Sequence, residues 1–247
     1  GVADDLLTPL PAATVERVPA EYRGSGDKWL AEMRLAEVIF YNRDMLGAAA
    51  APKDWDDLVT PAWKDKILIR DVAPSGTMRS IYAALISRSV AATGSPETGY
   101  ALLRSLDANT KDYTPNPSDL YLRIQRQEAP VSIWNLQDVL VQQKNGAPFT
   151  PVMPASGAPV LLDGVGKIKG GPNSAAADAF VSFLLQQDTQ QRLADESFQL
   201  PTVPLAKEPA WLSTVGGLKE MTVDWPAVSA HEKEWIDYWS QNIKGRG

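Results

Sequence analysis

The chain has 247 residues, enough for one large domain or two small ones with a sizeable buried core. Its formal net charge is -6 and no stripe of Lys and Arg is visible, which argues against a nucleic-acid partner. It contains no cysteine, which excludes disulfides, thiolate nucleophiles and zinc-finger patterns. The apolar runs are too short to span a bilayer. We therefore expect a soluble globular protein.

Apolar runs typical of strands alternate along the chain with helical periodicity, which predicts an α/β fold. The predicted strands are 37–41, 66–70, 130–134 and 149–153. The predicted helices are 77–90, 96–106, 117–127, 135–144, 174–196 and 226–243. The glycine-rich segment 163–171 resembles a phosphate loop, but Ile168 stands where that loop needs Ser or Thr. We predict a strand flanked by glycines there.

The stretch "APSGTMRS" forms a corner between a predicted strand and a predicted helix. Ser75 or Thr77 falls where a helix N-cap is expected, with Gly76 between them. One interpretation is an ordinary capped helix. The other is an anion site, because a helix start exposes unpaired N–H groups and glycine lets a ligand approach the backbone. Arg79, one turn further on, is either an additional contact to the anion or a solvated helix residue.

Few residues offer catalytic chemistry. His231 is the single histidine, and Ser229 lies two residues away, a spacing that does not bring side chains together on a helix. Asp54, Asp56 and Asp57 stand at a probable helix start, where carboxylates favour the helix dipole, so paired-carboxylate catalysis is the weaker interpretation. The absence of a convergent nucleophile and base favours a binding protein over a hydrolase or transferase.

The C-terminal helix is predicted to be amphipathic. Its buried face would consist of Trp235, Tyr238 and Trp239. The charged run 231–234 is expected to form its solvated face.

Residues 36–77, "AEVIFYNRDMLGAAAAPKDWDDLVTPAWKDKILIRDVAPSGT", resemble the solute-binding proteins of bacterial ABC importers, of the ferric-iron-binding type. The resemblance rests on a strand ending in Tyr-Asn, then Pro-x-x-Trp-x-Asp-Leu, Pro-x-Trp-Lys-x-Lys-Ile, and Ser-Gly at a helix start. The later segments "NSAAADAFVSFLLQQDTQQRLADES" and "LPTVP" agree with it. The resemblance covers nearly all of residues 34–215.

The resemblance implies a two-lobed, Venus-flytrap α/β fold, with ligand held in a cleft between the lobes. On that pattern 1–36 and 160–215 form the first lobe, and 37–155 and 216–247 form the second. Such proteins start with strand–helix–strand units, whereas only a short segment precedes the strand at 37–41. We therefore expect an incomplete first lobe.

The same resemblance assigns candidate ligand contacts in the second lobe. Ser75 and Gly76 correspond to the helix-start pair that grips an anion in the iron-binding relatives, and Thr77 continues that turn. Asn116, in "YTPNPS", corresponds to a second anion-contacting asparagine. We expect Ser75, Asn116 and Trp134 at one rim of the sheet of a compact lobe over 37–155, because ligands of open α/β sheets lie outside the carboxyl ends of the strands.

A third group of candidates lies in "VSIWNLQD". Trp134 and Asn135 stand where the relatives carry a pair of asparagines. Trp134 either stacks on a ligand or packs inside the lobe. Leu136 and Gln137 stand where the relatives carry two iron-binding tyrosines, and leucine supplies no oxygen ligand to ferric iron. We therefore expect no metal to be bound through tyrosines at these positions.

The sequence thus predicts a monomeric, non-enzymatic receptor with no cofactor, located in the periplasm or outside the cell, which captures a small solute and delivers it to a membrane permease. Three ligand classes stay open: iron held by other groups, a phosphonate or phosphorylated metabolite, and a polyamine or thiamine-like cation. The alternatives are an α/β enzyme such as a hydrolase or transferase, and a chain that binds nothing by itself.

Overall fold

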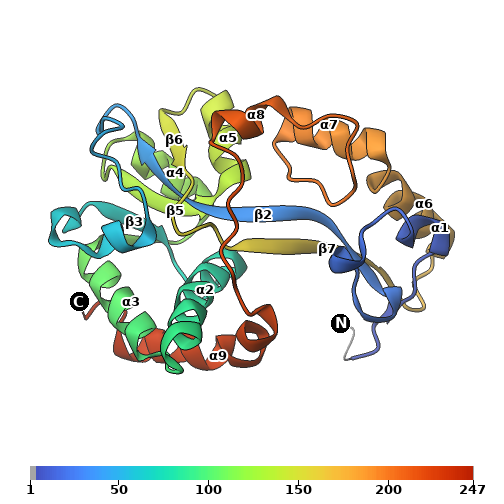
Figure 1. Cartoon of the computed structure of the whole chain (residues 1–247), viewed down its shortest axis with the longest axis horizontal. Helices are drawn as coiled ribbons and strands as arrows, with labels where there is room; N and C mark the ends of the chain where they lie inside the picture. Colours follow the sequence, from blue (N-terminus) through green and yellow to red (C-terminus); the bar gives the residue numbers. More distant parts are fainter. Residues whose placement is uncertain (1–3, 247) are drawn as a thin grey trace. The chain divides into compact units, whose positions relative to one another are not determined.

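The computed structural model describes residues 4–246 and divides into two compact units. Unit 1 consists of Gly1–Leu35 and Val160–Thr214, and unit 2 of Ala36–Pro159 and Val215–Gly247. Residues 1–3 and 247, which the sequence assigned to the first and second lobes, lie outside the described residues. Figure 1 shows both units along the chain.

Unit 2 is built on a mixed sheet. Strand β2 (Trp29–Asn42) contributes its second half and is joined by β3 (Ile67–Arg70), β4 (Thr110–Thr114), β5 (Val131–Asn135) and β6 (Phe149–Val152). The order is β6-β2-β5-β3-β4, with β3 parallel to both β4 and β5, and β2 antiparallel to β5 and β6. Parallel neighbours need long crossover connections, and helices supply them here.

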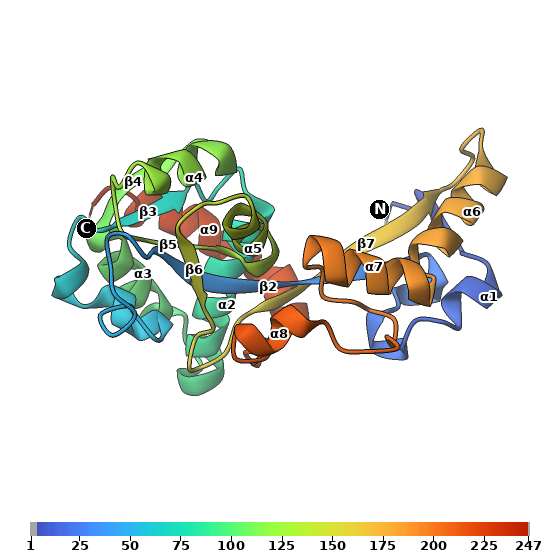
Figure 2. The same cartoon turned by 90° about the horizontal axis from the view of Figure 1, so that it is seen from above.

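Five helices cover the two faces of this sheet. They are α2 (Gly76–Thr93), α3 (Glu97–Asn109), α4 (Pro117–Gln125), α5 (Leu136–Lys144) and α9 (Trp225–Asn242). Helices α2, α3 and α9 lie on one face, and α4 and α5 on the other (Figures 1 and 2). The core between them is large and aromatic. Tyr82 of α2, for example, meets Trp239 of α9 edge to face with 5.2 Å between ring centroids.

Two short 3-10 helices, Trp55–Val59 and Pro61–Trp63, precede β3. Asp54 caps the first of them in a capping box with Asp57, which confirms the structural interpretation of the acidic run. Among the described residues, none of the helices combines the length and apolar character that crossing a membrane requires.

Unit 1 is smaller. Its strands are β1 (Leu7–Thr8), β7 (Val160–Ile168) and the first half of β2, with β1 antiparallel to β7. Its helices are α1 (Ala12–Val15), α6 (Ser174–Leu184), α7 (Gln187–Ser197) and α8 (Ala210–Thr214), with 3-10 turns at Ala20–Tyr22 and Ser25–Asp27. A compact apolar cluster holds them together: Leu10, Val15, Val18, Leu30, Val181, Leu185 and Val203.

The predicted elements are largely confirmed, and the short elements β1, α1, α8 and the 3-10 helices other than Trp55–Val59 were not predicted. Three differences concern the longer elements and the main sheet. The helix predicted over 174–196 is wrong as one element, because Gln186 is extended (φ -73°, ψ 145°) and separates α6 from α7. Strand β2 begins at Trp29, well before the predicted start. Strand β4 was not predicted, because this edge strand exposes Lys111 and Asp112 and has no apolar run. The glycine-flanked strand predicted at 163–171 is confirmed as part of β7.

Candidate functional site

Three helices of unit 2 begin at the same edge of its sheet. Because β3, β4 and β5 are parallel, their carboxyl ends meet at one edge, and α2, α4 and α5 follow them directly or after a short loop. The adjacent strands β5 and β3 lead to helices on opposite faces of the sheet (Figure 1). In α/β sheets, such a change of face at neighbouring carboxyl ends opens a crevice where ligands bind.

Each of these helices starts at a residue that the sequence singled out. Ser75 Oγ, Asn116 Oδ1 and Asn135 Oδ1 each accept a hydrogen bond from the backbone N–H three residues later, at 3.3, 2.8 and 2.8 Å. Of the two alternatives for α2, Ser75 is therefore the cap, and Thr77 lies inside the first turn. The remaining N–H groups of three helix starts point toward the carboxyl edge.

The start of α2 is the most favourable of the three for an anion. The first turns of α4 and α5 carry Asp119 and Asp138, which offset the positive end of the dipole, whereas the first turn of α2 carries no acidic residue. Gly76 is exposed, and the nearest atom outside the helix backbone to a Cβ placed there is Nη2 of Arg79 at 3.9 Å. The backbone at this point is therefore open to a ligand.

Arg79 is paired with neighbouring groups, unlike the solvated helix residue of one alternative, and its contact to an anion stays a prediction. Its Nε atom lies 2.6 Å from Glu232 Oε1 on α9, and its Nη1 atom donates to the carbonyl of Ala73 at 3.0 Å. Its guanidinium group is thus part of the support of the loop before α2.

A carboxylate organises the start of α5. Asp138 Oδ2 accepts hydrogen bonds from Tyr121 Oη at 2.7 Å, Trp134 Nε1 at 2.9 Å and Asn135 Nδ2 at 3.2 Å. Burial and the neighbouring Asp138 charge raise the pKa of Tyr121, so its hydroxyl stays a donor. Trp134 is only 4% exposed, which favours the packed alternative over a stacking platform. Sequence reasoning missed Asp138, although its spacing of three from Asn135 is that of a capping pair.

The two positions at which the resemblance led us to look for iron-binding tyrosines hold no phenolate in this chain. Leu136 is buried at the first position of α5, and Gln137 is partly exposed beside it. Within the part of the chain that the structure describes, no group of three or more His, Cys, Asp or Glu side chains is arranged to hold a metal ion. His231 lies exposed on α9, 3.3 Å from Glu234 and stacked on Trp235.

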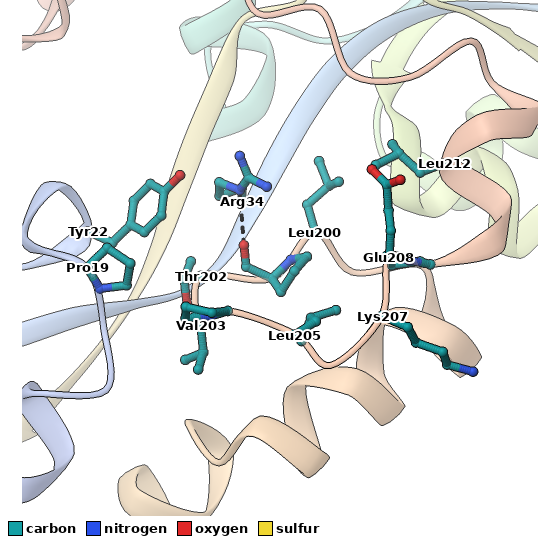
Figure 3. A pocket seen from close by; sticks show the side chains of 13 residues that line it. Pro19, Tyr22, Arg34, Leu200, Thr202, Val203, Leu205, Lys207, Glu208 and Leu212 are labelled. Carbon is teal, nitrogen blue, oxygen red and sulfur yellow. Dashed lines mark hydrogen bonds between the residues drawn. The ribbon is translucent and has the colours of Figure 1, made fainter.

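Unit 1 carries a pocket of a different character, with a volume of about 380 Å³ (Figure 3). Prolines, leucines and Val203 form most of its wall. Arg34 donates from Nε to the carbonyl of Pro201 at 3.1 Å, and its guanidinium carbon lies 5.7 Å from the centroid of the Tyr22 ring. This wall suits apolar groups better than a small anion.

Comparison with solved structures identifies the fold. Apo ferric ion-binding protein A of Pasteurella haemolytica superposes with a TM-score of 0.81 at 22% identity, covering 97% of this chain and 77% of that one. This confirms the predicted α/β fold of the two-lobed periplasmic binding proteins.

Sequence comparison gives the family. Iron uptake protein A2 of Synechocystis sp. is 27% identical over 83% of this chain and 61% of its own length. A putative 2-aminoethylphosphonate-binding periplasmic protein of Salmonella typhimurium is 26% identical over 66% and 48%, respectively. The chain spans 57% to 61% of the length of the first three curated relatives it matches. Residues 2–215 match the family described as bacterial extracellular solute-binding protein. The chain therefore belongs to the bacterial extracellular solute-binding proteins.

Proposed function

We propose that this chain is the ligand-binding receptor of an ABC importer. It captures a small anionic or oxygen-rich solute outside the cytoplasm and delivers it to a membrane permease without catalysing a reaction. Units 1 and 2 correspond in this proposal to the two predicted lobes, and unit 2 supplies the anion contacts.

The observation that carries the proposal is the convergence of three capped helix starts at the carboxyl edge of unit 2. Ser75, Gly76 and Thr77 would present the N–H groups of α2 to the anion, while Asn116 and Asn135 begin the other two helices. Family membership supports a ligand of this kind, as do the relatives named as an iron uptake protein and a putative 2-aminoethylphosphonate-binding protein.

Among the open ligand classes, the site favours a phosphonate or phosphorylated metabolite. Such a group accepts several hydrogen bonds from backbone N–H donors. It fits the start of α2, where no acidic side chain in the first turn offsets the positive end of the helix dipole. Ferric iron prefers anionic oxygen ligands, and Leu136 and Gln137 supply none where the family's tyrosines stand. Trp134, buried among core side chains, serves in this proposal to hold Asp138.

The test is ligand-dependent stabilisation of the purified chain. We would measure thermal unfolding and titration calorimetry with inorganic phosphate, 2-aminoethylphosphonate, fructose 6-phosphate, ferric citrate, spermidine and thiamine. A ligand at one hundred times its Kd should raise the unfolding free energy by about 2.7 kcal/mol. Stabilisation by the phosphonate or a phosphate supports the proposal. Stabilisation by spermidine or thiamine alone, or by none of the probes, contradicts it.

A further inference from the structure

The C-terminal helix α9 lies outside the part of the chain that matches the family. The match ends at residue 215, and α9 spans Trp225–Asn242. Yet α9 packs along α2, the helix whose start is proposed to hold the anion, with Tyr82 against Trp239. The residues that support the start of α2 are therefore contributed by a segment that the family pattern does not describe.

One ion pair connects this segment directly to residues 71–75, which we call the cradle loop, and a second reaches the loop through Arg79 of α2. Glu232 Oε1 holds Arg79 Nε at 2.6 Å, and the same guanidinium binds the carbonyl of Ala73 in the loop. Lys244 Nζ holds Asp71 Oδ1 at 2.6 Å, at the end of β3 where the loop begins. Both pairs are only about one-third exposed, so solvent screens them incompletely.

Lys244 is itself held in place. The backbone N–H groups of Gly245 and Arg246 donate to the buried carboxylate of Asp107 at 3.0 and 3.2 Å. Tyr113 also donates to Asp107, and the Lys244 ammonium lies 5.1 Å from the centroid of the Tyr113 ring. Because the backbone after Lys244 and the Tyr113 ring hold its ammonium in place, the ion pair restricts the position of Asp71.

We propose that Glu232 and Lys244 are positioning residues of the anion site: they fix the cradle loop so that the N–H groups at the start of α2 point at the ligand. This inference rests on the proposed function. Neither residue lies in the helix-start turn itself. Their effect on the ligand is indirect, through Arg79, Ala73 and Asp71.

Whether Glu232→Gln tightens or weakens anion binding separates a positioning role from an effect of charge alone. Glu232→Gln removes a negative charge near an anion site and releases Arg79, so an effect of charge alone would tighten anion binding. Positioning predicts the opposite, because the loop loses its support. Lys244→Met should weaken binding as well, and Lys244→Arg should restore it by keeping the charge and reaching the same carboxylate.

The experiment compares Glu232→Gln and Lys244→Met with control variants on α9, Glu234→Gln and Lys233→Met. Glu232 lies on the same helix as the controls, and Lys244 lies just beyond its end at Asn242. The control side chains are exposed, and their ion pairs lie within α9: Glu234 pairs with His231, and Lys233 pairs with Asp237. With 2-aminoethylphosphonate and phosphate as probes, we expect a roughly threefold to tenfold loss of affinity in the two test variants and less than twofold in the controls.

Amide hydrogen exchange of peptides covering residues 71–79, measured without ligand, separates failure of this inference from failure of the proposed function. Faster exchange there in both test variants, and unchanged exchange in both controls, supports positioning even if no probe binds the wild-type chain. Unchanged exchange in the test variants overturns the inference, and so does tighter anion binding by Glu232→Gln. Absence of probe binding by the wild-type chain overturns the proposed function alone.

Discussion

Replacing Gly76 by valine should separate a helix cap from an anion site. Gly76 is the first residue of α2, its φ is not in the left-handed region, and it is exposed. A Cβ there lies 3.9 Å from the Arg79 side chain, an ordinary van der Waals distance. A β-carbon at this position therefore meets no clash, and valine needs no strained backbone conformation there.

The expected magnitudes differ strongly between folding and binding. Valine has a better helix propensity than glycine by a few tenths of a kcal/mol and reduces the freedom of the unfolded chain, so the unfolding free energy should change by less than about 0.5 kcal/mol or rise slightly. In the binding site, the two methyl groups would lie between the ligand and the N–H groups of the first turn. Losing one charge-assisted hydrogen bond, worth about 1.5–3 kcal/mol, lowers affinity roughly tenfold to a hundredfold.

The assay is titration calorimetry with 2-aminoethylphosphonate and phosphate at fixed ionic strength, alongside urea unfolding of the same samples. Gly47→Val is the matched control, since Gly47 is also exposed, has no positive φ and has open space around it. We expect both variants to fold normally and only Gly76→Val to lose affinity. A strong loss of stability with unchanged affinity for every anion would refute the reasoning and leave Ser75 and Gly76 as a structural helix start.

Further predictions concern stability and its pH dependence. Asn135→Ala should lower the unfolding free energy by about 1 kcal/mol in urea titrations, because it removes the cap of α5. Burial raises the pKa of Tyr113, whose hydroxyl donates to Asp107, so the folded state keeps a proton that the unfolded chain loses near pH 10. Stability should therefore be retained below about pH 10 and fall as the pH rises further, and Tyr113→Phe should flatten that fall in urea unfolding between pH 8 and 11. Burial and then the charge of Asp163 raise the pKa of Glu32. Charging Glu32 opposes folding at neutral pH, so Glu32→Gln should raise the urea midpoint at pH 7 and lose this gain below about pH 4.

Local patterns in the sequence were sufficient for much of unit 2. Strand β5 is buried at every position and reads as an apolar run, and α4 and α5 begin at asparagines whose caps reach only three residues along the chain. Strand β4 was not predicted, because it lies at the edge of the sheet and its residues are mostly polar, so it lacks the apolar run that marks a buried strand. The break between α6 and α7 escaped because the polar run 186–192 contains no Gly or Pro that would mark a helix end, and only the extended backbone of Gln186 separates the two helices.

The candidate site depends both on contacts between residues close in the sequence and on contacts between residues far apart. The caps could be identified from the sequence, because cap and N–H are neighbours in the chain. The contacts that hold the site join residues far apart: Arg79 meets Glu232 across 153 residues, and Asp71 meets Lys244 across 173.

Helical phase carries part of this missing information. In the run 231–234, Glu232 alone lies both three residues before Trp235 and seven residues before Trp239, and both tryptophans are buried. Glu232 therefore borders the packed face of α9. Glu234, by contrast, is exposed. The phase therefore indicates that Glu232 faces a neighbouring element, which the prediction of a uniformly solvated run overlooked. It does not indicate which cation that element offers. Arg79 becomes its partner only because α2 and α9 pack on the same face of the sheet, and that placement follows from the tertiary fold.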